Sequence, residues 1–225
     1  LAGDHLQLPP LVFSQDAIDL EYDKSILELG FQKTKNIYFL DTQYRMRSSI
    51  ASFSSEYFYG GELKTAENLN DESSHIFFYD TAGAGFEEAQ GDGGKSLLNV
   101  GELDFTTKLI EYHKITLDDL AFISPYSSQV EKAKNTLPSG VKVSTIDSFQ
   151  GQEKHTVIIS LVRSNNEGVI GFLKDYRRMN VAMTRAKEQL IIIGDSSTIG
   201  NDPFYEKLLN YIESIESYKS VWELL

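Results

Sequence analysis

Short apolar runs along the chain alternate with longer stretches in which apolar residues recur every three or four positions. The runs are continuous, which is typical of strands buried on both faces, and they lie at residues 37–40, 75–79, 120–124, 141–146, 156–162 and 189–193. Helical spacing covers residues 16–30, a segment after Arg45, residues 99–114, 127–137 and 172–187, and a segment from Pro203. This alternation predicts an α/β fold with a mostly parallel sheet and helices on both of its faces.

Residues 172–187 are the most informative of the helical stretches. As a single helix, they would place five apolar side chains on one stripe: Phe172, Tyr176, Met179, Met183 and Ala186. Arg178 and Arg185 would share a second face. A fixed cationic face beside a buried strand suits phosphate binding, although arginines on a solvated helix face would show the same spacing.

Polar clusters follow several of the predicted strands directly. They lie at residues 41–45, 125–129, 147–153 and 163–166. Because ligands of parallel sheets collect beyond the carboxyl ends of the strands, we expect these clusters to gather along one edge of the sheet. The glycine-rich stretch 81–98 is predicted to be a loop.

Charge and composition narrow the function classes. The formal net charge of −12 argues against a protein coated for nonspecific nucleic-acid binding, yet a local group of cations stands out at Lys174, Arg177, Arg178, Arg185 and Lys187. The chain has no Cys, and its four His show no paired ligand spacing, so no structural metal is predicted. No stretch has the length of a membrane span or the form of a signal peptide. We therefore expect no membrane partner and an intracellular location, cytoplasmic with a nuclear location left open.

Five segments resemble, in the same order, the motifs of superfamily 1 helicases of the nonsense-mediated-decay and senataxin type. Residues 3–10 (GDHLQLPP) resemble motif III and residues 41–46 (DTQYRM) motif IV. Residues 123–130 (ISPYSSQV) resemble motif IVa, residues 144–153 (STIDSFQGQE) motif V, and residues 171–187 motif VI. The order and spacing agree over nearly the whole chain, which is more specific than any one motif.

The resemblance implies a RecA-like P-loop NTPase fold and an ATP-dependent motor. Residues 1–35 would be the tail of a first RecA-like domain and a connector, and residues 36–225 the second RecA-like domain. Gln7 would sense the γ-phosphate, and Arg45 and Arg185 would clamp it, because a guanidinium group is always charged and forks onto phosphate oxygens.

Further binding roles follow from the same resemblance. Glu153 would hydrogen-bond the ribose, Tyr44 would lie near the base or sugar, and Gly151 would belong to the same nucleotide-binding group. Five residues would lie along a single strand of DNA or RNA: Pro125, Tyr126, Thr145, Gln150 and Arg163. The choice between DNA and RNA stays open, since such contacts go mainly to the backbone and the base faces.

Each position also has a purely structural interpretation. Arg45 could pair with Asp41, Gln7 could satisfy a turn, Glu153 could be a solvated loop carboxylate, and Tyr126 could belong to the core. The chain also departs from the family pattern, with Arg47-Ser48 where the family usually has His-Pro.

The phosphate loop and the acidic Mg²⁺ site of such a motor are not evident. Gly94-Lys95-Ser96 fits the end of the loop, but Ala89 stands where the first glycine is required. We expect the carboxyl-terminal motor domain of a 5′-to-3′ DNA or RNA helicase, inactive by itself. The rest of the ATP site and most Mg²⁺ ligands would come from an amino-terminal RecA-like domain of the same parent chain. The alternatives are a non-catalytic RecA-like interaction module and a small independent NTPase that uses residues 94–96.

Overall fold

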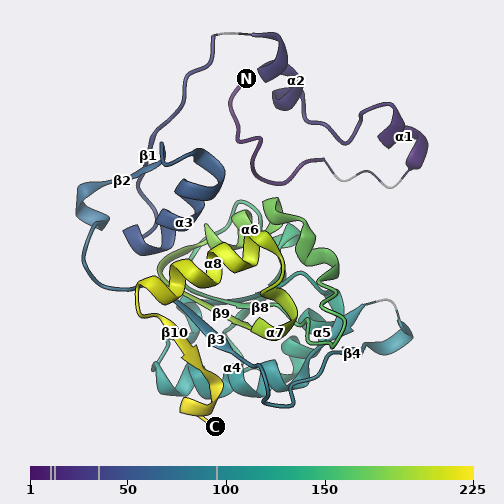
Figure 1. Ribbon diagram of the computed structural model, residues 1–225, viewed down its shortest axis with the longest axis vertical. Coiled ribbons are helices and arrows are strands. Elements are labelled where there is room, and N and C mark those ends of the chain that lie inside the picture. Colours follow the sequence, from purple (N-terminus) through teal and green to yellow (C-terminus); the bar gives the residue numbers. More distant parts are fainter. Residues whose placement is uncertain (11, 13, 35, 95) are drawn as a thin grey trace.

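A six-stranded parallel sheet forms the centre of the computed structural model, which describes residues 1–10, 12, 14–34, 36–94 and 96–225 (Figure 1). The strand order is β10-β3-β9-β8-β6-β7, and every neighbouring pair is parallel. The strands are β3 (Ile76–Asp80), β6 (Leu120–Ser124), β7 (Lys142–Thr145), β8 (Lys154–Ser160), β9 (Ala186–Gly194) and β10 (Tyr218–Ser220). The predicted α/β fold with a parallel sheet is confirmed.

Helices cover both faces of the sheet (Figure 1). One face carries α3 (Ser48–Tyr59), α6 (Tyr176–Met183), α7 (Ser196–Ile199) and α8 (Pro203–Ser214). The other face carries α4 (Val100–Tyr112) and α5 (Ser127–Thr136). The central strands β8 and β9 are therefore buried on both sides, as Ile158 and Ile159 show with no exposed area. Double burial is the reason why their sequences are continuous apolar runs.

Polar side chains set the points at which the helices begin. Asn99, Asp175 and Asp202 each accept a hydrogen bond from a backbone N–H in the first turn of the helix that follows, and Pro203 stands at the first turn of α8. Gly60, with φ of 60°, ends α3 in the left-handed conformation. Helices α3, α4, α5 and α8 lie close to the predicted spans.

The amino-terminal region differs from the prediction. In place of one helix over residues 16–30, the structure has α1 (Gln15–Asp19) and α2 (Ile26–Lys33), because Ser25 and Glu28 form a capping box that starts a new helix. Residues 37–40 are not a strand, and Tyr38 is 93% exposed. The nearest strand is β1 (Thr42–Gln43), which pairs with β2 (Lys64–Thr65) outside the main sheet. The apolar run at 37–40 thus has no sheet to join within the described residues.

The single helix predicted over residues 172–187 is also wrong. Gly171–Lys174 is a 3₁₀ turn, Asp175 caps α6, and α6 ends at Met183. The chain then enters β9 at Ala186, which pairs with Lys154 of β8. Phe172 is 60% exposed and not part of the buried stripe. Pairing with β8 overrides the helical spacing, so Arg178 and Arg185 do not share a helix face.

The predicted polar clusters reach two edges of the sheet instead of one. Glu153 and Arg185 come directly before β8 and β9, at the edge where strands begin, whereas Pro125 and Arg163 follow β6 and β8 at the edge where strands end. Residues 147–153 cross from one edge to the other between β7 and β8. Strand order alone did not reveal this, because a short connection between parallel strands has to span the sheet.

The remaining elements are short. Residues 81–98 contain an antiparallel pair, β4 (Ala89–Gln90) with β5 (Leu97–Leu98), and are more ordered than the predicted loop; Lys95, part of the tentative phosphate loop, lies outside the described residues. The other 3₁₀ turns are Glu67–Leu69, Asp92–Gly94, Leu117–Asp119, Asp147–Phe149 and Val221–Glu223. In the part of the chain that the structure describes, no helix has the length and apolar character needed to cross a membrane.

Candidate nucleotide and nucleic-acid sites

Arg45 and Glu153 form the centre of the first site, at the edge where the strands begin. Arg45 Nε donates to Glu153 Oε2 at 2.5 Å, and Arg45 Nη1 donates to the backbone oxygen of Thr184 at 3.1 Å. Lys187 Nζ lies 2.6 Å from Glu153 Oε1. The hydrogen bond from Lys187, together with the one from Arg45, holds the pKa of the Glu153 carboxyl below its ordinary value. Two cations thus share one carboxylate.

The turn before α3 fixes where Arg45 points. Gln43 Oε1 accepts from the backbone N–H groups of Arg45 and Met46, both at 2.8 Å. Its Nε2 donates to the Met46 carbonyl at 2.8 Å and to Thr65 Oγ1 at 2.9 Å. Met46 is buried in the core, and this burial also holds the turn in place. Asp41, the alternative partner for Arg45, pairs with Lys64 instead.

Arg185 lies beside this pair and is only 4% exposed. Its Nε donates to the Val181 carbonyl at 3.0 Å, its Nη2 to Thr184 Oγ1 at 3.2 Å, and its Nη1 to the Gln152 carbonyl at 3.5 Å. Burial, assisted by the positive charge of Arg45, lowers the pKa of Arg185 to about 10. Within the described residues, no carboxylate lies within 4.0 Å of its guanidinium group.

Three cations gather at this edge of the sheet. Arg45 and Lys187 both pair with Glu153, Arg185 lies beside them, and anions are the ligands that such a group of cations attracts. Arg178, by contrast, is held by Asp147 at 3.4 Å and by Asp175 at 2.9 Å. Arg178 is therefore a structural residue.

Two adjoining cavities open beside Arg45. One of about 1080 Å³ is lined by Gln7, Arg45 and Thr184 among others. A second of about 590 Å³ is lined by Tyr44, Arg45, Glu153 and Lys187, and Tyr44 is 76% exposed there. The structure thus brings Gln7, Arg45, Tyr44 and Glu153 to two adjoining cavities. Gly151, with φ of 80°, and the buried Arg185 line neither of them.

Gln7 is held at the rim of the larger cavity. Its Nε2 donates to Asp4 Oδ2 at 2.8 Å, and the same oxygen accepts from the Tyr59 hydroxyl at 2.6 Å. Asn180 Nδ2, from α6, donates to the Leu6 carbonyl at 3.0 Å and to the Tyr59 oxygen at 3.1 Å. Gln7 therefore takes part in a local turn and also lies on the cavity that contains Arg45.

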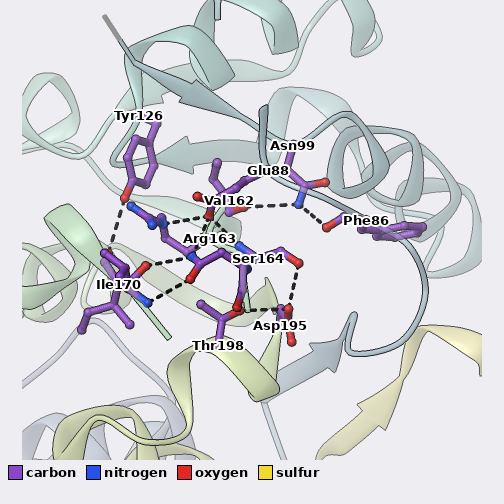
Figure 2. Close-up of polar contacts among 12 residues, drawn as sticks. Phe86, Glu88, Asn99, Tyr126, Val162, Arg163, Ser164, Ile170, Asp195 and Thr198 are labelled. Carbon is purple, nitrogen blue, oxygen red and sulfur yellow. Dashed lines mark hydrogen bonds and ion pairs between the residues drawn. The ribbon is translucent and has the colours of Figure 1, made fainter. Parts of the chain in front are cut away.

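Arg163 and Tyr126 lie at the opposite edge of the sheet, and Figure 2 shows them with their partners. Arg163 is 8% exposed, and its Nε lies 2.8 Å from Glu88 Oε2, an ion pair in which the N–H does not point along the contact. Tyr126 is 2% exposed, and its hydroxyl donates to the Ile170 carbonyl at 3.5 Å. Tyr126 thus lies in the core, which was its alternative interpretation. In this conformation its ring is not accessible to a nucleic-acid strand.

The other predicted nucleic-acid residues are more accessible. Thr145 ends β7, half-buried, and its Oγ1 donates to Ser148 Oγ at 3.0 Å. Gln150 is exposed, and Pro125 is half-buried just after β6. Pro125 and Arg163 lie at one edge of the sheet, and Gln150 lies in the connection between β7 and β8.

Residues 22–197 match the family model described as an AAA domain. The chain belongs to this family. It is 32% identical over 247 residues to "DNA-binding protein SMUBP-2" of Rattus norvegicus, covering 100% of this chain and 25% of that protein. It is 33% identical to "Probable helicase MAGATAMA 3" of Arabidopsis thaliana, covering 100% and 30%, and 32% identical to "Helicase SEN1" of Saccharomyces cerevisiae, covering 93% and 10%.

These relatives confirm the resemblance to superfamily 1 helicases of the senataxin type that the motifs indicated. This AAA domain spans a third or less of the length of each of them. The C-terminal domain of a possible DNA helicase from Lactobacillus plantarum WCFS1 aligns with a TM-score of 0.45 and 15% identity, over 80% of this chain and 99% of that one. A likeness of that size has no bearing on function.

The departure at Arg47 has a structural explanation in this AAA domain. Arg47 Nε donates to Glu188 Oε2 at 2.6 Å, its Nη1 lies 3.3 Å from Asp71 Oδ2, and its backbone N–H donates to the Lys187 carbonyl at 3.0 Å. The side chain ties the start of α3 to β9.

Three functional candidates of the AAA domain were missed from the sequence. Lys187 was counted only as one of a group of cations, although its place beside Glu153 follows from the pairing of β8 with β9. Glu88 lies in the glycine-rich stretch, where no local signal marks it as the partner of Arg163. Glu102 looks like a solvated helix residue in the sequence but has no exposed area.

The cations beside the cavities suit an anionic ligand such as a polyphosphate. The described residues contain no group of three or more His, Asp or Glu side chains that could hold a metal ion.

Proposed function

We propose that residues 36–225 form the second RecA-like domain of an ATP-dependent 5′-to-3′ helicase that acts on DNA or RNA. Residues 1–35 would be the tail of the first RecA-like domain and a connector. The observation that carries this proposal is the cluster of Arg45 and Lys187, both paired with Glu153, with the buried Arg185 beside them and two adjoining cavities that share Arg45. Support for helicase activity comes from the relatives described as helicases, and the unwinding polarity is inferred only from the motif resemblance.

The chemistry of the clamp follows from the geometry. Bound ATP, with Mg²⁺ ligands from a partner domain of the same parent chain, would supply the phosphoryl group. Arg185, held by backbone carbonyls, would meet the γ-phosphate without losing a competing carboxylate. Arg45 would exchange Glu153 for phosphate, and Gln7 would reach the same cavity. Charge that develops on the γ-phosphate oxygens is stabilised most by cations already in place.

The freed Glu153 would turn to the ribose, with Tyr44 beside the base or sugar and Gly151 shaping the loop before it. A single strand would run past Pro125, Thr145 and Gln150. Arg163 would meet a phosphate of the strand in place of Glu88, with Tyr126 packed beneath it. Because the proposed helicase uses ATP and a polynucleotide as substrates, we also propose an intracellular location, cytoplasmic or nuclear.

The decisive experiment compares arginine and lysine in the full-length protein. Arg185→Lys and Arg45→Lys should each lower nucleic-acid-stimulated ATP hydrolysis by about a thousand-fold while the fold is retained, because lysine cannot fork onto phosphate oxygens. Arg178→Lys is the matched control, since Arg178 is held by two aspartates. Normal ATP hydrolysis in both variants would show that Arg45 and Arg185 do not clamp the γ-phosphate.

A non-catalytic interaction module is the second candidate. The ion pair between Arg45 and Glu153 favours it, because both charges are satisfied without a nucleotide. If the wild-type full-length protein and its Arg185→Ala variant bind ATP analogues with the same affinity, the interaction module is supported. Nucleic-acid-stimulated hydrolysis would eliminate it.

A further inference from the structure

Val162 has a conformation that branched residues rarely adopt. Its φ is 70°, in the left-handed region, and it lies two residues after the end of β8. The backbone N–H of Arg163 donates to the Leu161 carbonyl at 2.8 Å, so Val162 is the middle residue of a three-residue turn. Strained backbone persists only where surrounding groups hold it, and it collects at functional sites.

Side chains at the start of α4 bind both backbone polar groups of Val162. The Val162 N–H donates to Glu102, at 3.1 Å from each carboxyl oxygen. Asn99 Nδ2 donates to the Val162 carbonyl at 3.2 Å, and Figure 2 shows this contact. Asn99 and Glu102 have no exposed area. Two buried side chains therefore replace the sheet contacts that a strand residue would have.

These two side chains are themselves fixed. Asn99 Oδ1 accepts from the Glu102 N–H at 3.1 Å, and Ser160 Oγ donates to Glu102 Oε2 at 2.5 Å. Gln129 Nε2 donates to Ser160 Oγ at 2.8 Å. Burial raises the pKa of Glu102 to about 8, while the hydrogen bonds that it accepts from Ser160 and Val162 act in the opposite direction.

The turn decides the direction of the residues that follow it. Arg163 is the next residue, and its guanidinium meets Glu88. The Ser164 N–H donates to the same Glu88 oxygen at 2.8 Å, and Ser164 Oγ donates to Asp195 Oδ2 at 2.8 Å. If Val162 relaxed to a negative φ, the chain after it would leave this direction, and Arg163 would lose its place.

We propose that Asn99 and Glu102 are positioning residues that hold Val162 in the left-handed conformation and thereby aim Arg163 at the nucleic-acid strand. The inference rests on the proposed contact between Arg163 and that strand. It adds two residues that no helicase motif quoted above contains, and it gives their burial and mutual contacts a purpose beyond stability.

The test uses the freedom of glycine at φ > 0. In the full-length protein, Glu102→Ala should weaken binding of a fluorescein-labelled single-stranded oligonucleotide by about ten-fold, the equivalent of one lost strong hydrogen bond. Val162→Gly alone should leave binding within about two-fold of the original, because glycine adopts the turn without support. Glu102→Ala with Val162→Gly should restore binding, although the stability lost through Glu102→Ala should not return. Thr106→Ala, a buried change one turn along α4, is the control.

The outcomes separate this inference from the proposed function. Restored affinity without restored stability supports positioning, since a purely structural role would not recover. A double variant as weak as Glu102→Ala would overturn the inference. If Arg163→Ala leaves oligonucleotide binding unchanged, the proposed contact between Arg163 and the strand is wrong.

Crystal structures test separately whether Glu102 holds the turn. They should show a negative φ at Val162 in Glu102→Ala and a positive φ at the glycine in the double variant. A positive φ at Val162 in Glu102→Ala would overturn the inference.

Discussion

Arg45 and Glu153 are 108 residues apart in the sequence, and their Nε and Oε2 atoms lie 2.5 Å apart. Glu153 occupies the position beside Arg45 that an anionic ligand would take, while its other oxygen holds Lys187. A nucleotide phosphate bound at Arg45, as proposed above, would compete with this carboxylate. Glu153 would then control access of phosphate to Arg45 in addition to its proposed contact with the ribose.

Removing the carboxylate should strengthen binding of simple phosphate. Glu153→Gln leaves Arg45 and Lys187 without their shared anion, and we expect affinity for inorganic pyrophosphate to rise by up to about five-fold, the effect of one exposed ion pair. Isothermal titration of the wild-type protein and the variant measures this. Asp41→Asn, which removes the partner of Lys64, is the control and should leave the affinity for pyrophosphate unchanged. Weaker pyrophosphate binding in Glu153→Gln would show that Glu153 does not compete.

Gly171 should resist substitution. A Cβ atom there would lie 2.5 Å from Arg163 Nη1 and 3.0 Å from the Tyr126 hydroxyl, and its φ is 56°. We expect Gly171→Ala to lower the free energy of unfolding by about 2–4 kcal/mol, because overpacking adds to the left-handed penalty. Gly83→Ala is the matched control, with φ of 74° but open space around it, and should cost only about 1–2 kcal/mol. Urea denaturation distinguishes the two, and equal losses would contradict the steric argument.

Glu102 should make stability fall as the pH rises. Its pKa is raised by burial to about 8, so the folded state keeps the proton that the unfolded state releases near its ordinary pKa. The contribution is complete below about pH 4.5 and is lost as the pH rises through about 8, with an upper limit on the order of 4–5 kcal/mol. Unfolding curves between these limits, for the wild-type protein and Glu102→Gln, measure the slope. The same slope in both would assign the pH dependence to another group.

Arg47 should contribute modestly. Its contacts with Glu188 and Asp71 are half-exposed, so Arg47→Ala should lower the free energy of unfolding only slightly. Phe53→Ala, a change in the core on the same helix, should lower it by about 3–5 kcal/mol. A comparison of the denaturation midpoints of the two variants tests this difference. A loss at Arg47 as large as that at Phe53 would mean that the turn before α3 depends on this arginine.

The chain itself determined the layers of the fold. Strands β6, β8 and β9 are continuous apolar runs because they are buried on both faces, and Asp202 with Pro203 marks the start of α8 by local capping. The order of the motifs identified the family. These features depend on residues close in sequence, or on their order along it, so they can be predicted without coordinates.

Only the tertiary structure decided the partners. Arg185 lies outside α6 because the next residue, Ala186, pairs with Lys154. Arg45 pairs with Glu153 and not with Asp41, which is nearer in the sequence. Tyr126 was buried because Gly171 leaves room for it beside Arg163. Each outcome depends on pairing between distant segments. Such pairing is set by sheet register and packing, which no local pattern records.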